Sequence, residues 1–429
     1  MASRSAMPQP IPRWLHRDPH ELLSFTAQYT PRTARAFSFI YGTFCYTAPM
    51  DSKELSKKAL ALHKKLQGKI RIVPSQAVKN RDDLSLVYTP GVAAVSTYVA
   101  KHPKEARDYT IKGRTIAVIS DGSAVLGLGN IGPYGALPVM EGKCALFKTF
   151  ADVDAFPIVL DTQDTDEVVE TIKHLAPAFG GINLEDFAAP RCFEIEERLK
   201  EALDIPVMHD DQHGTAIAVL AALYNAAKVV DKKFTALRVV ISGAGAAGTA
   251  IAKLLLLAGV KDIVVLDSKG VINLVRKDLS PHKKELAKVT NSRGLHGGLM
   301  DALEGADAFI GVSGPNLMKA AGVKKMAKKA IVFAMANPVP EIMPEEAKKG
   351  GAAVIGTGRS DYPNQINNSL VFPGVFRGAL DHKVTKITDM MKLKAAKNLA
   401  ALVVRPTADK IIPGPFEKGI AAAVSKAIR

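Results

Sequence analysis

Two pairs of adjacent carboxylates carry the clearest chemical signal in this chain of 429 residues. Glu185-Asp186 and Asp210-Asp211 are separated by one predicted helix over residues 192–203. Hard divalent cations such as Mg²⁺ and Mn²⁺ take oxygen ligands, commonly a few carboxylates together with substrate and water. The same acids could instead cap the helices that follow them, because carboxylates accept hydrogen bonds from free N–H groups at helix N-termini. The spacing alone supports metal binding and capping equally.

The second acidic pair is flanked by His209 and His213, which are four residues apart. Imidazoles at this spacing share one face of a helix and can both bind a metal. Histidines are also common at helix ends without any metal, so this pair is only a weak candidate.

Two other side chains are candidates for proton transfer. Tyr88 stands just before the Pro-Gly turn of Tyr88-Thr89-Pro90-Gly91, and Lys143 stands beside a glycine at the start of a predicted apolar helix or strand. A lysine acts as a general base only where burial or a nearby cation lowers its pKa toward neutrality. Taken singly, each of these residues could also be an ordinary surface side chain.

A dinucleotide-binding pattern stands in the second half of the chain. A predicted strand over residues 239–241 runs into Gly243-Ala244-Gly245-Ala246-Ala247-Gly248, and a predicted helix over 249–258 follows. In this motif Gly243 permits the tight turn, Gly245 lets the backbone approach the pyrophosphate, and Gly248 lets helix and strand pack closely. The free N–H groups of the helix N-terminus would bind the phosphates.

The next predicted strand ends in Asp267, at the position where an acid binds the ribose hydroxyls. An acid there favours NAD, whereas Ser268 and Lys269 just beyond it could accept the 2′-phosphate of NADP. The sequence therefore predicts a bound dinucleotide and leaves the choice between NAD and NADP open.

The order of predicted elements places these residues on two α/β units. Residues 213–429 alternate strand-like runs with helical spacers, which indicates βαβ units on a parallel sheet. Residues 50–212 mix helices with two apolar strands that each end in an Asp-bearing loop. Ligands bind outside the carboxyl ends of parallel strands, so loops there should line the cleft, although Gly, Asn and Pro are also ordinary turn formers. The expected strands are 116–119, 156–160, 238–242, 263–267, 308–312, 331–334 and 353–355, and the expected cleft loops are 313–316, 337–338 and 356–358.

Residues 1–49 differ in composition from the rest of the chain, because they are rich in arginine, lack lysine and hold the single tryptophan, Trp14. An Arg-rich, acid-poor segment suits an organellar transit peptide. The break at Met50 equally suits an extension upstream of an alternative start, and an arm packed on a partner subunit is a third interpretation. We predict a mostly disordered extension, followed by one domain over 50–212 and a dinucleotide-binding domain over 213–429.

The overall composition, with 47% apolar residues, indicates a globular protein. The sequence contains no uninterrupted run of 18 apolar residues, which argues against a transmembrane helix. The formal charge is +15, but the lysines are scattered without Arg-rich blocks, so we expect no nucleic-acid binding. Cys45, Cys144 and Cys192 lack CxxC spacing, which argues against disulfides and structural zinc and favours a reducing compartment. We expect a cytoplasmic location, or an organellar matrix if residues 1–49 are a transit peptide.

Taken together, these motifs resemble those of the malic enzymes. The likeness runs in order from about residue 50 to the C-terminus and is similar to the compact form, without an appended acyltransferase domain. It is carried by Tyr88-Thr89-Pro90-Gly91, Ser120-Asp121-Gly122-Ser123, Gly127-Leu128-Gly129-Asn130, Glu141-Gly142-Lys143, Leu184-Glu185-Asp186-Phe187, His209-Asp210-Asp211-Gln212-His213-Gly214-Thr215-Ala216, Phe333-Ala334-Met335-Ala336-Asn337-Pro338 and Asn367-Asn368-Ser369-Leu370-Val371-Phe372-Pro373-Gly374.

The resemblance implies a Rossmann-like doubly wound parallel sheet domain plus an N-terminal α/β malic domain. It also implies a homodimer that oxidatively decarboxylates L-malate to pyruvate and CO₂ with NAD or NADP and Mg²⁺ or Mn²⁺. The matching positions are Glu185, Asp186 and Asp211 as metal ligands, Lys143 as general base, Tyr88 as general acid, Asn337 and Asn368 at the substrate carboxylate with Asn337 also beside the cofactor, and Asp210 as a modulator of the lysine.

The chain departs from the longer malic enzymes at one position, where an arginine that helps bind malate precedes their Gly-Leu-Gly segment. Ser123-Ala124-Val125 stands there instead, which leaves open how the distal carboxylate of malate is held; Ser123 and the Tyr88-Thr89 loop are candidates. Two other functions compete with the resemblance. One is a related decarboxylase of oxaloacetate or a dehydrogenase of another 2-hydroxy acid, and the other is a non-catalytic protein that binds nucleotides or nucleic acid.

Overall fold

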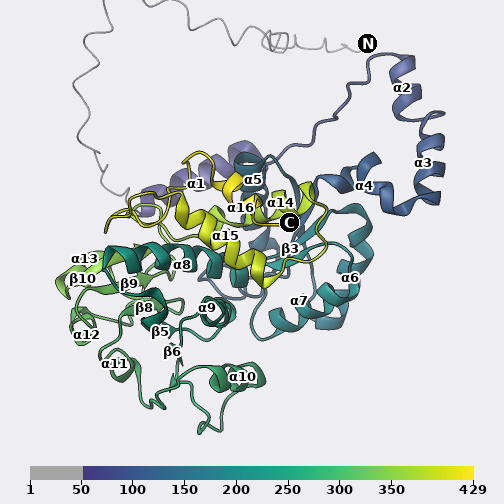
Figure 1. The fold of residues 1–429 in the computed structure, drawn as a ribbon. Helices are drawn as coiled ribbons and strands as arrows, with labels where there is room; N and C mark the ends of the chain where they lie inside the picture. Colours follow the sequence, from purple (N-terminus) through teal and green to yellow (C-terminus); the bar gives the residue numbers. More distant parts are fainter. Residues whose placement is uncertain (1–51) are drawn as a thin grey trace, which may run out of the picture. The chain divides into compact units, whose positions relative to one another are not determined.

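The computed structural model describes residues 52–429 of the chain (Figure 1). Residues 1–51, and with them the predicted extension over 1–49, lie outside the described residues. Two parallel sheets and the helices around them make up most of the described chain, so the expected α/β fold class is confirmed. No helix in this part of the chain has the length and apolar character needed to cross a bilayer.

The first sheet has four parallel strands in the order β2-β1-β3-β4. All residues of the central strand β1 are buried, as expected where helices cover both faces of a parallel sheet. The sequence analysis identified β1 and β2 but missed β3 and β4, because these strands are only four and three residues long. The strands are β1 (Thr115–Ser120), β2 (Asp154–Val159), β3 (Gly181–Leu184) and β4 (Val207–His209), and the helices between them are α5 (Gly132–Ala151), α6 (Thr165–Leu175) and α7 (Arg191–Ala202).

The second sheet has six strands in the order β10-β9-β8-β5-β6-β7, all parallel except β7. The five strands predicted for this half of the chain are all present, with ends that differ from the prediction by no more than two residues. The strands are β5 (Arg238–Ser242), β6 (Asp262–Asp267), β7 (Gly270–Val271), β8 (Ala308–Gly311), β9 (Ala330–Ala334) and β10 (Ala352–Thr357), and the helices are α9 (Ala246–Leu257), α10 (Pro281–Val289), α11 (Leu299–Ala302), α12 (Ala320–Lys325) and α13 (Pro344–Lys349).

Helix α8 (Asp210–Val229) connects the two sheets, since it begins directly after β4 and ends shortly before β5. Most of its residues are buried, which its run of alanines and leucines permits on every face. Helix α9 packs along one side of it, and α15 (Asp389–Ala401) packs along another (Figure 1). The remaining C-terminal helices are α14 (Phe372–Asp381) and α16 (Ile420–Ser425).

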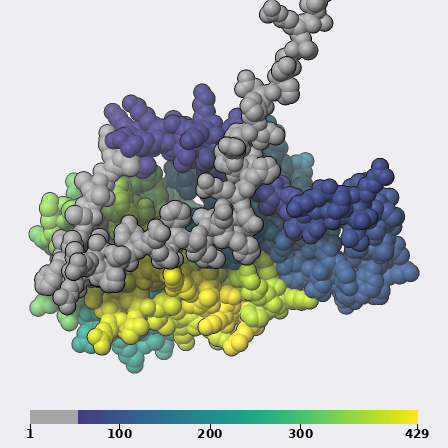
Figure 2. Space-filling model, turned by 90° about the horizontal axis from the view of Figure 1, so that it is seen from above, coloured from purple at the N-terminus to yellow at the C-terminus, as the bar shows by residue number. Residues whose placement is uncertain are grey.

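The segment over residues 71–111, here called the α2–α3 segment, leaves its apolar side chains uncovered. Ile72 and Leu86, for example, are 77% and 75% exposed. Figure 2 shows this segment in dark blue at the molecular surface. Its helices are α2 (Arg81–Val87), α3 (Val92–Lys101) and α4 (Ala106–Tyr109), and α1 (Ser52–Leu66) precedes it.

Candidate active site

The carboxylates of Glu185, Asp186 and Asp211 converge at one edge of the first sheet. Glu185 and Asp186 directly follow β3, and Asp211 lies in the first turn of α8, directly after β4. Leu184 pairs with His209 in the register of these strands, so the residues that follow meet at the carboxyl edge. Ligand oxygens of the three acids lie within 4.8 Å of one another, and the described part of the chain holds no other such group of His, Cys, Asp or Glu.

Burial destabilises this cluster of negative charge when no cation is bound. Burial and the neighbouring carboxylate of Asp211 raise the pKa of Asp186 to about 7. Burial also raises the pKa of Glu185 well above its ordinary value, although the ammonium of Lys143 opposes the shift. The Oδ2 atom of Asp186 is buried and has no hydrogen-bond partner. A set of oxygen donors with one buried oxygen left unsatisfied fits Mg²⁺ or Mn²⁺.

Lys143 projects from α5 toward the same acids. Its Nζ atom lies 2.5 Å from Oδ2 of Asp210 and 2.9 Å from Oε1 of Glu185, and 4.4 Å from the centre of the Phe372 ring. Burial alone would lower the pKa of the ammonium, but the charges of Asp210 and Glu185 outweigh burial and raise it above the ordinary value. A pKa this high keeps the lysine protonated while the acids have no other counter-ion.

The expectation that Lys143 begins a helix or strand was wrong, because it lies in the middle of α5. The neighbouring Gly142 does not interrupt the helix, since an isolated glycine is tolerated inside one. The position where a Cβ of Gly142 would stand is 3.8 Å from Nζ of Lys69. That distance is an ordinary van der Waals contact, so the space around Gly142 does not require a glycine.

Helix capping does not account for the two acidic pairs. Helix α7 begins at Arg191, well beyond Glu185 and Asp186. Helix α8 begins at Asp210 itself, and the residue at its N-cap, His209, makes no side-chain capping bond. The capping alternative is wrong because the acids either precede the helix by several residues or already lie within its first turn.

The two flanking histidines lie outside the carboxylate cluster. His209 is completely buried, and its Nε2 lies 3.3 Å from Oδ2 of Asp211. His213 lies on the opposite side of the acidic turn, where its Nε2 is 2.9 Å from Oε1 of Glu196. His209 therefore contacts a carboxylate of the cluster, Asp211. His213 contacts Glu196, a residue that the sequence analysis missed.

Asn337 and Asn368 come from the second half of the chain and reach the first. A Cβ added to Gly214 would lie 3.0 Å from Cβ of Asn368 and would collide with the Asp210 carboxylate. A Cβ added to Gly127 would collide with the carbonyl oxygen of Asn337. Gly214 thus lets Asn368 lie close to Asp210, and Gly127 lets the backbone of Asn337 lie close to the loop that follows β1.

Tyr88 does not join this group within the same chain. It follows α2, and its side chain is 65% exposed, whereas Lys143 is buried. Figure 1 shows α2 standing away from α5, the helix that carries Lys143. The spacing of the motifs along the chain could not reveal this separation, because it depends on how the α2–α3 segment is placed in space.

The glycine motif lies where the winding of the second sheet reverses, between β5 and β8. Gly243 has a φ of 118°, and a Cβ there would lie 2.5 Å from the carbonyl oxygen of Val312. A Cβ on Gly248 would collide with the carbonyl of Gly243, whereas one on Gly245 would meet open space. A cavity of about 680 Å³ opens in front of the motif and includes the predicted cleft loop Ser313-Gly314. Such a position is where open α/β sheets bind dinucleotides.

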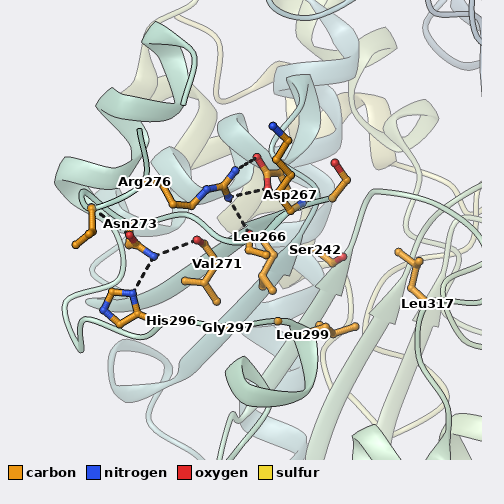
Figure 3. A pocket seen from close by; sticks show the side chains of 15 residues that line it. Ser242, Leu266, Asp267, Val271, Asn273, Arg276, His296, Gly297, Leu299 and Leu317 are labelled. Atoms are coloured by element: carbon orange, nitrogen blue, oxygen red, sulfur yellow. Dashed lines mark hydrogen bonds and ion pairs between the residues drawn. The ribbon is translucent and has the colours of Figure 1, made fainter. Parts of the chain in front are cut away.

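Asp267, at the end of β6, is held by two cations that the sequence analysis missed, Arg276 and Lys283, and Figure 3 shows the contact with Arg276. The guanidinium of Arg276 donates to both carboxylate oxygens, at 2.8 and 3.1 Å, and Nζ of Lys283 lies 2.7 Å away. Burial opposes ionisation, but these hydrogen bonds lower the pKa of Asp267 to about 2. Lys269, which with Ser268 was a candidate to bind a 2′-phosphate, pairs with Asp278. Arg276 also lines a second cavity of about 670 Å³ beside the first.

The fold and the site define an α/β protein in which a dinucleotide-binding sheet stands next to a cluster of acids and a buried lysine. Residues 67–200 match the malic enzyme N-terminal domain, and residues 212–426 match the malic enzyme NAD-binding domain. The chain belongs to the malic enzyme family, so the resemblance seen in the sequence is confirmed.

Individual relatives include both cofactor types. An NAD-dependent malic enzyme of Geobacillus stearothermophilus is 55% identical over 87% of this chain and 78% of its own length. An NADP-dependent malic enzyme of Halomonas elongata is 44% identical over 86% of this chain and 92% of its own length. The crystal structure of the NAD-dependent malic enzyme of Thermotoga maritima superposes with a TM-score of 0.83, at 50% identity over 86% of this chain and 98% of that one.

Proposed function

We propose that this protein oxidatively decarboxylates L-malate to pyruvate and CO₂, with NAD⁺ or NADP⁺ as oxidant and Mg²⁺ or Mn²⁺ bound by Glu185, Asp186 and Asp211. The observation that carries the proposal is the contact of buried Lys143 with Glu185 and Asp210, at the edge where the three acids meet. This contact supports a role for Lys143 as a base beside the proposed metal ligands, as removal of a hydroxyl proton from a chelated 2-hydroxy acid requires.

The bound cation would polarise the hydroxyl and the adjacent carboxylate of malate and stabilise the negative charge that forms as CO₂ leaves. By neutralising the acids around Lys143 it would also remove the cause of the raised lysine pKa. Lys143 would then accept the C2 hydroxyl proton, and the bound dinucleotide would supply the oxidising power by taking the hydride from C2. Asp210 keeps the lysine in place, Asn337 and Asn368 hold the substrate carboxylate, and Tyr88 returns a proton to C3.

The direct test mixes purified protein with L-malate, Mn²⁺ and either NAD⁺ or NADP⁺, and measures reduced cofactor and pyruvate together. We expect equal molar amounts of the two products. Pyruvate formed from oxaloacetate, without cofactor reduction from malate, would instead identify the decarboxylase alternative. Absence of any turnover would reject the proposed activity.

We expect Asp211→Asn to weaken Mn²⁺ binding by more than the 10- to 100-fold that loss of an outer-shell partner typically produces. The reason is that Asp211 supplies one of only three carboxylates in the cluster. Isothermal titration with Mn²⁺ after removal of metal by EDTA measures the effect. Glu194→Gln is the matched control, because Glu194 is an exposed acid that pairs with Arg198 on α7. Equal Mn²⁺ affinity in both variants would exclude Asp211 as a ligand.

We propose that NAD⁺ is the better cofactor, because Asp267 ends β6 at the position where a carboxylate accepts hydrogen bonds from the ribose hydroxyls. Asp267→Ala should shift the ratio of kcat/KM toward NADP⁺ by about 10- to 100-fold, the range expected for one charged hydrogen bond. The substitution removes the acceptor of the 2′-hydroxyl and frees Arg276 and Lys283 for a 2′-phosphate. Arg276→Ala should move the ratio in the opposite direction. An unchanged ratio in both variants would contradict this assignment.

We also propose that the protein is a homodimer whose second copy covers the α2–α3 segment. Exposed apolar side chains gathered on one segment are typical of an interaction surface, and a self-complementary surface forms most simply about a two-fold axis. Tyr88 lies within the segment, so the second copy would receive this residue near its own Lys143. The apolar residues exposed there are Ile72, Val73, Val78, Leu84, Leu86, Val87, Val95, Tyr98, Tyr109 and Ile111.

Two further assignments belong to this proposal. Residues 50–212 would act as the substrate and metal domain and residues 213–429 as the dinucleotide domain, joined through α8. We place the protein in the cytoplasm, because Cys144 and Cys192 are buried free thiols. Cell fractionation with an antibody against the protein tests the location.

A further inference from the structure

Glu196 is a buried carboxylate that lies behind the acidic turn of α8 and belongs to none of the motifs. It projects from α7 and is 5% exposed. A carboxylate inside a protein is costly unless hydrogen bonds or cations compensate its charge. The donors that surround Glu196 therefore indicate what the residue does.

Those donors come from the turn that carries the metal-binding acid. The backbone N–H of His209 donates to Oε1 of Glu196 at 3.0 Å, and Nε2 of Gln212 donates to Oε2 at 3.2 Å. The ring of His213 is within 2.9 Å of the same carboxylate. On the other side, Nζ of Lys200 lies 2.6 Å from Oε1 and supplies the compensating charge.

The two sides of this turn thus have separate partners. Asp210 and Asp211 face Lys143, Glu185 and Asp186, whereas the residues before and after them are bound to Glu196. His209, the N-cap residue of α8, makes no side-chain capping hydrogen bond. The hydrogen bonds to Glu196 therefore hold the first turn of α8 against α7. On the opposite side, Oδ2 of Asp211 accepts the N–H of Asp186 at 2.8 Å.

We propose that Glu196 is a positioning residue for the metal site: by binding His209, Gln212 and His213 it sets the rotation of the first turn of α8 that brings Asp211 to Glu185 and Asp186. The inference rests on the proposed function for the identity of the metal ligands. Outer-shell partners of this kind orient ligands and contribute to metal affinity without contacting the metal.

The test compares Glu196→Ala with Glu196→Gln in the full-length protein. Isothermal titration measures Mn²⁺ binding, and thermal unfolding in EDTA measures stability without metal. We expect Glu196→Ala to weaken Mn²⁺ binding by about 10- to 100-fold. Glu196→Gln should recover part of the affinity, because its amide oxygen still accepts the hydrogen bonds made at one of the two carboxylate oxygens, whereas its NH2 group cannot accept those made at the other. At saturating Mn²⁺, kcat of the alanine variant should return close to the wild-type value.

Asp307→Asn is the matched control for general destabilisation. Asp307 is also a buried carboxylate, 8% exposed, with Lys232 and the backbone N–H of Arg238 as partners, but it lies at the start of β8, on a sheet that carries none of the acids of the cluster. It should lower the unfolding temperature and leave Mn²⁺ affinity unchanged. If Glu196→Ala does not fold, Gln212→Ala removes one of the three ties and should weaken Mn²⁺ binding by a smaller factor.

The outcomes separate this inference from the proposed function. A wild-type protein that binds no Mn²⁺ would reject the metal site itself. Wild-type binding with unchanged affinity in Glu196→Ala would reject only the positioning role. Equal weakening in the alanine and glutamine variants would also reject it, because charge and not hydrogen bonding would then be responsible.

Discussion

Replacing Lys143 by alanine is expected to lower kcat for malate oxidation by about 10²- to 10⁴-fold, the usual contribution of one general acid or base. The reason is that Nζ of Lys143 lies 2.9 Å from Glu185 and 2.5 Å from Asp210, so its neutral amine would stand beside the proposed metal ligands, where the hydroxyl proton must be removed. Steady-state rates at saturating malate, Mn²⁺ and cofactor measure the effect. Retention of more than about a tenth of the wild-type rate would contradict a role as base.

Lys148→Ala on the same helix is the matched control. Lys148 is 57% exposed and pairs with the surface acids Asp152 and Asp154, so its removal should leave kcat unchanged. The Mn²⁺ affinity of Lys143→Ala should also be measured. The expected result is binding at least as tight as in the wild type, because the acids lose a competing cation. Loss of Mn²⁺ binding would attribute the inactivity to the metal site instead.

Two inactive variants, Tyr88→Phe and Lys143→Ala, are expected to restore activity when combined in one heterodimer. If Tyr88 acts in the site of the second copy, one of the two sites in the heterodimer contains both residues intact. Activity should then return to about half that of the wild-type dimer, as two-fold symmetry requires. The expectation follows from the exposure of Tyr88 on the α2–α3 segment, away from the Lys143 of its own chain.

Co-expression with two different affinity tags isolates the heterodimer, and sedimentation establishes its size. Tyr88→Phe homodimers and Lys143→Ala homodimers are the controls for residual activity. An inactive heterodimer of the correct mass would show that Tyr88 acts within its own chain. A monomeric wild-type protein would reject the proposed dimer.

Local sequence patterns were sufficient to predict much of the fold and many of the candidate site residues. Five of the six strands of the second sheet and the Gly243-Ala244-Gly245-Ala246-Ala247-Gly248 motif were predicted, because periodicity and turn residues act over short distances; the two-residue strand β7 was missed. Glu185, Asp186 and Asp211 were identified as candidates because adjacent carboxylates offer the oxygen ligands that hard divalent cations prefer. The family itself was evident from motifs in order along the chain, and comparison with relatives confirmed it.

Other features depended on contacts between residues distant in sequence. Capping and metal binding could be separated only when the register of β3 and β4 brought Leu184 opposite His209. No local pattern indicates that Arg276 and Lys283 bind Asp267, because the path of the chain after β6 brings these two cations to the carboxylate. The same holds for Glu196, whose role depends on the packing of α7 against α8.

The sequence by itself therefore determined the fold class, the family and the identity of the candidate acids and lysine, because residue type and short-range spacing specify strands, turns and donor chemistry. Only the tertiary structure decided which of these groups share a buried site and which do not. Burial and neighbouring charges raise the pKa of Asp186 and of Lys143. Tyr88, in contrast, lies exposed on the α2–α3 segment. These properties arise from long-range packing, which no local pattern encodes.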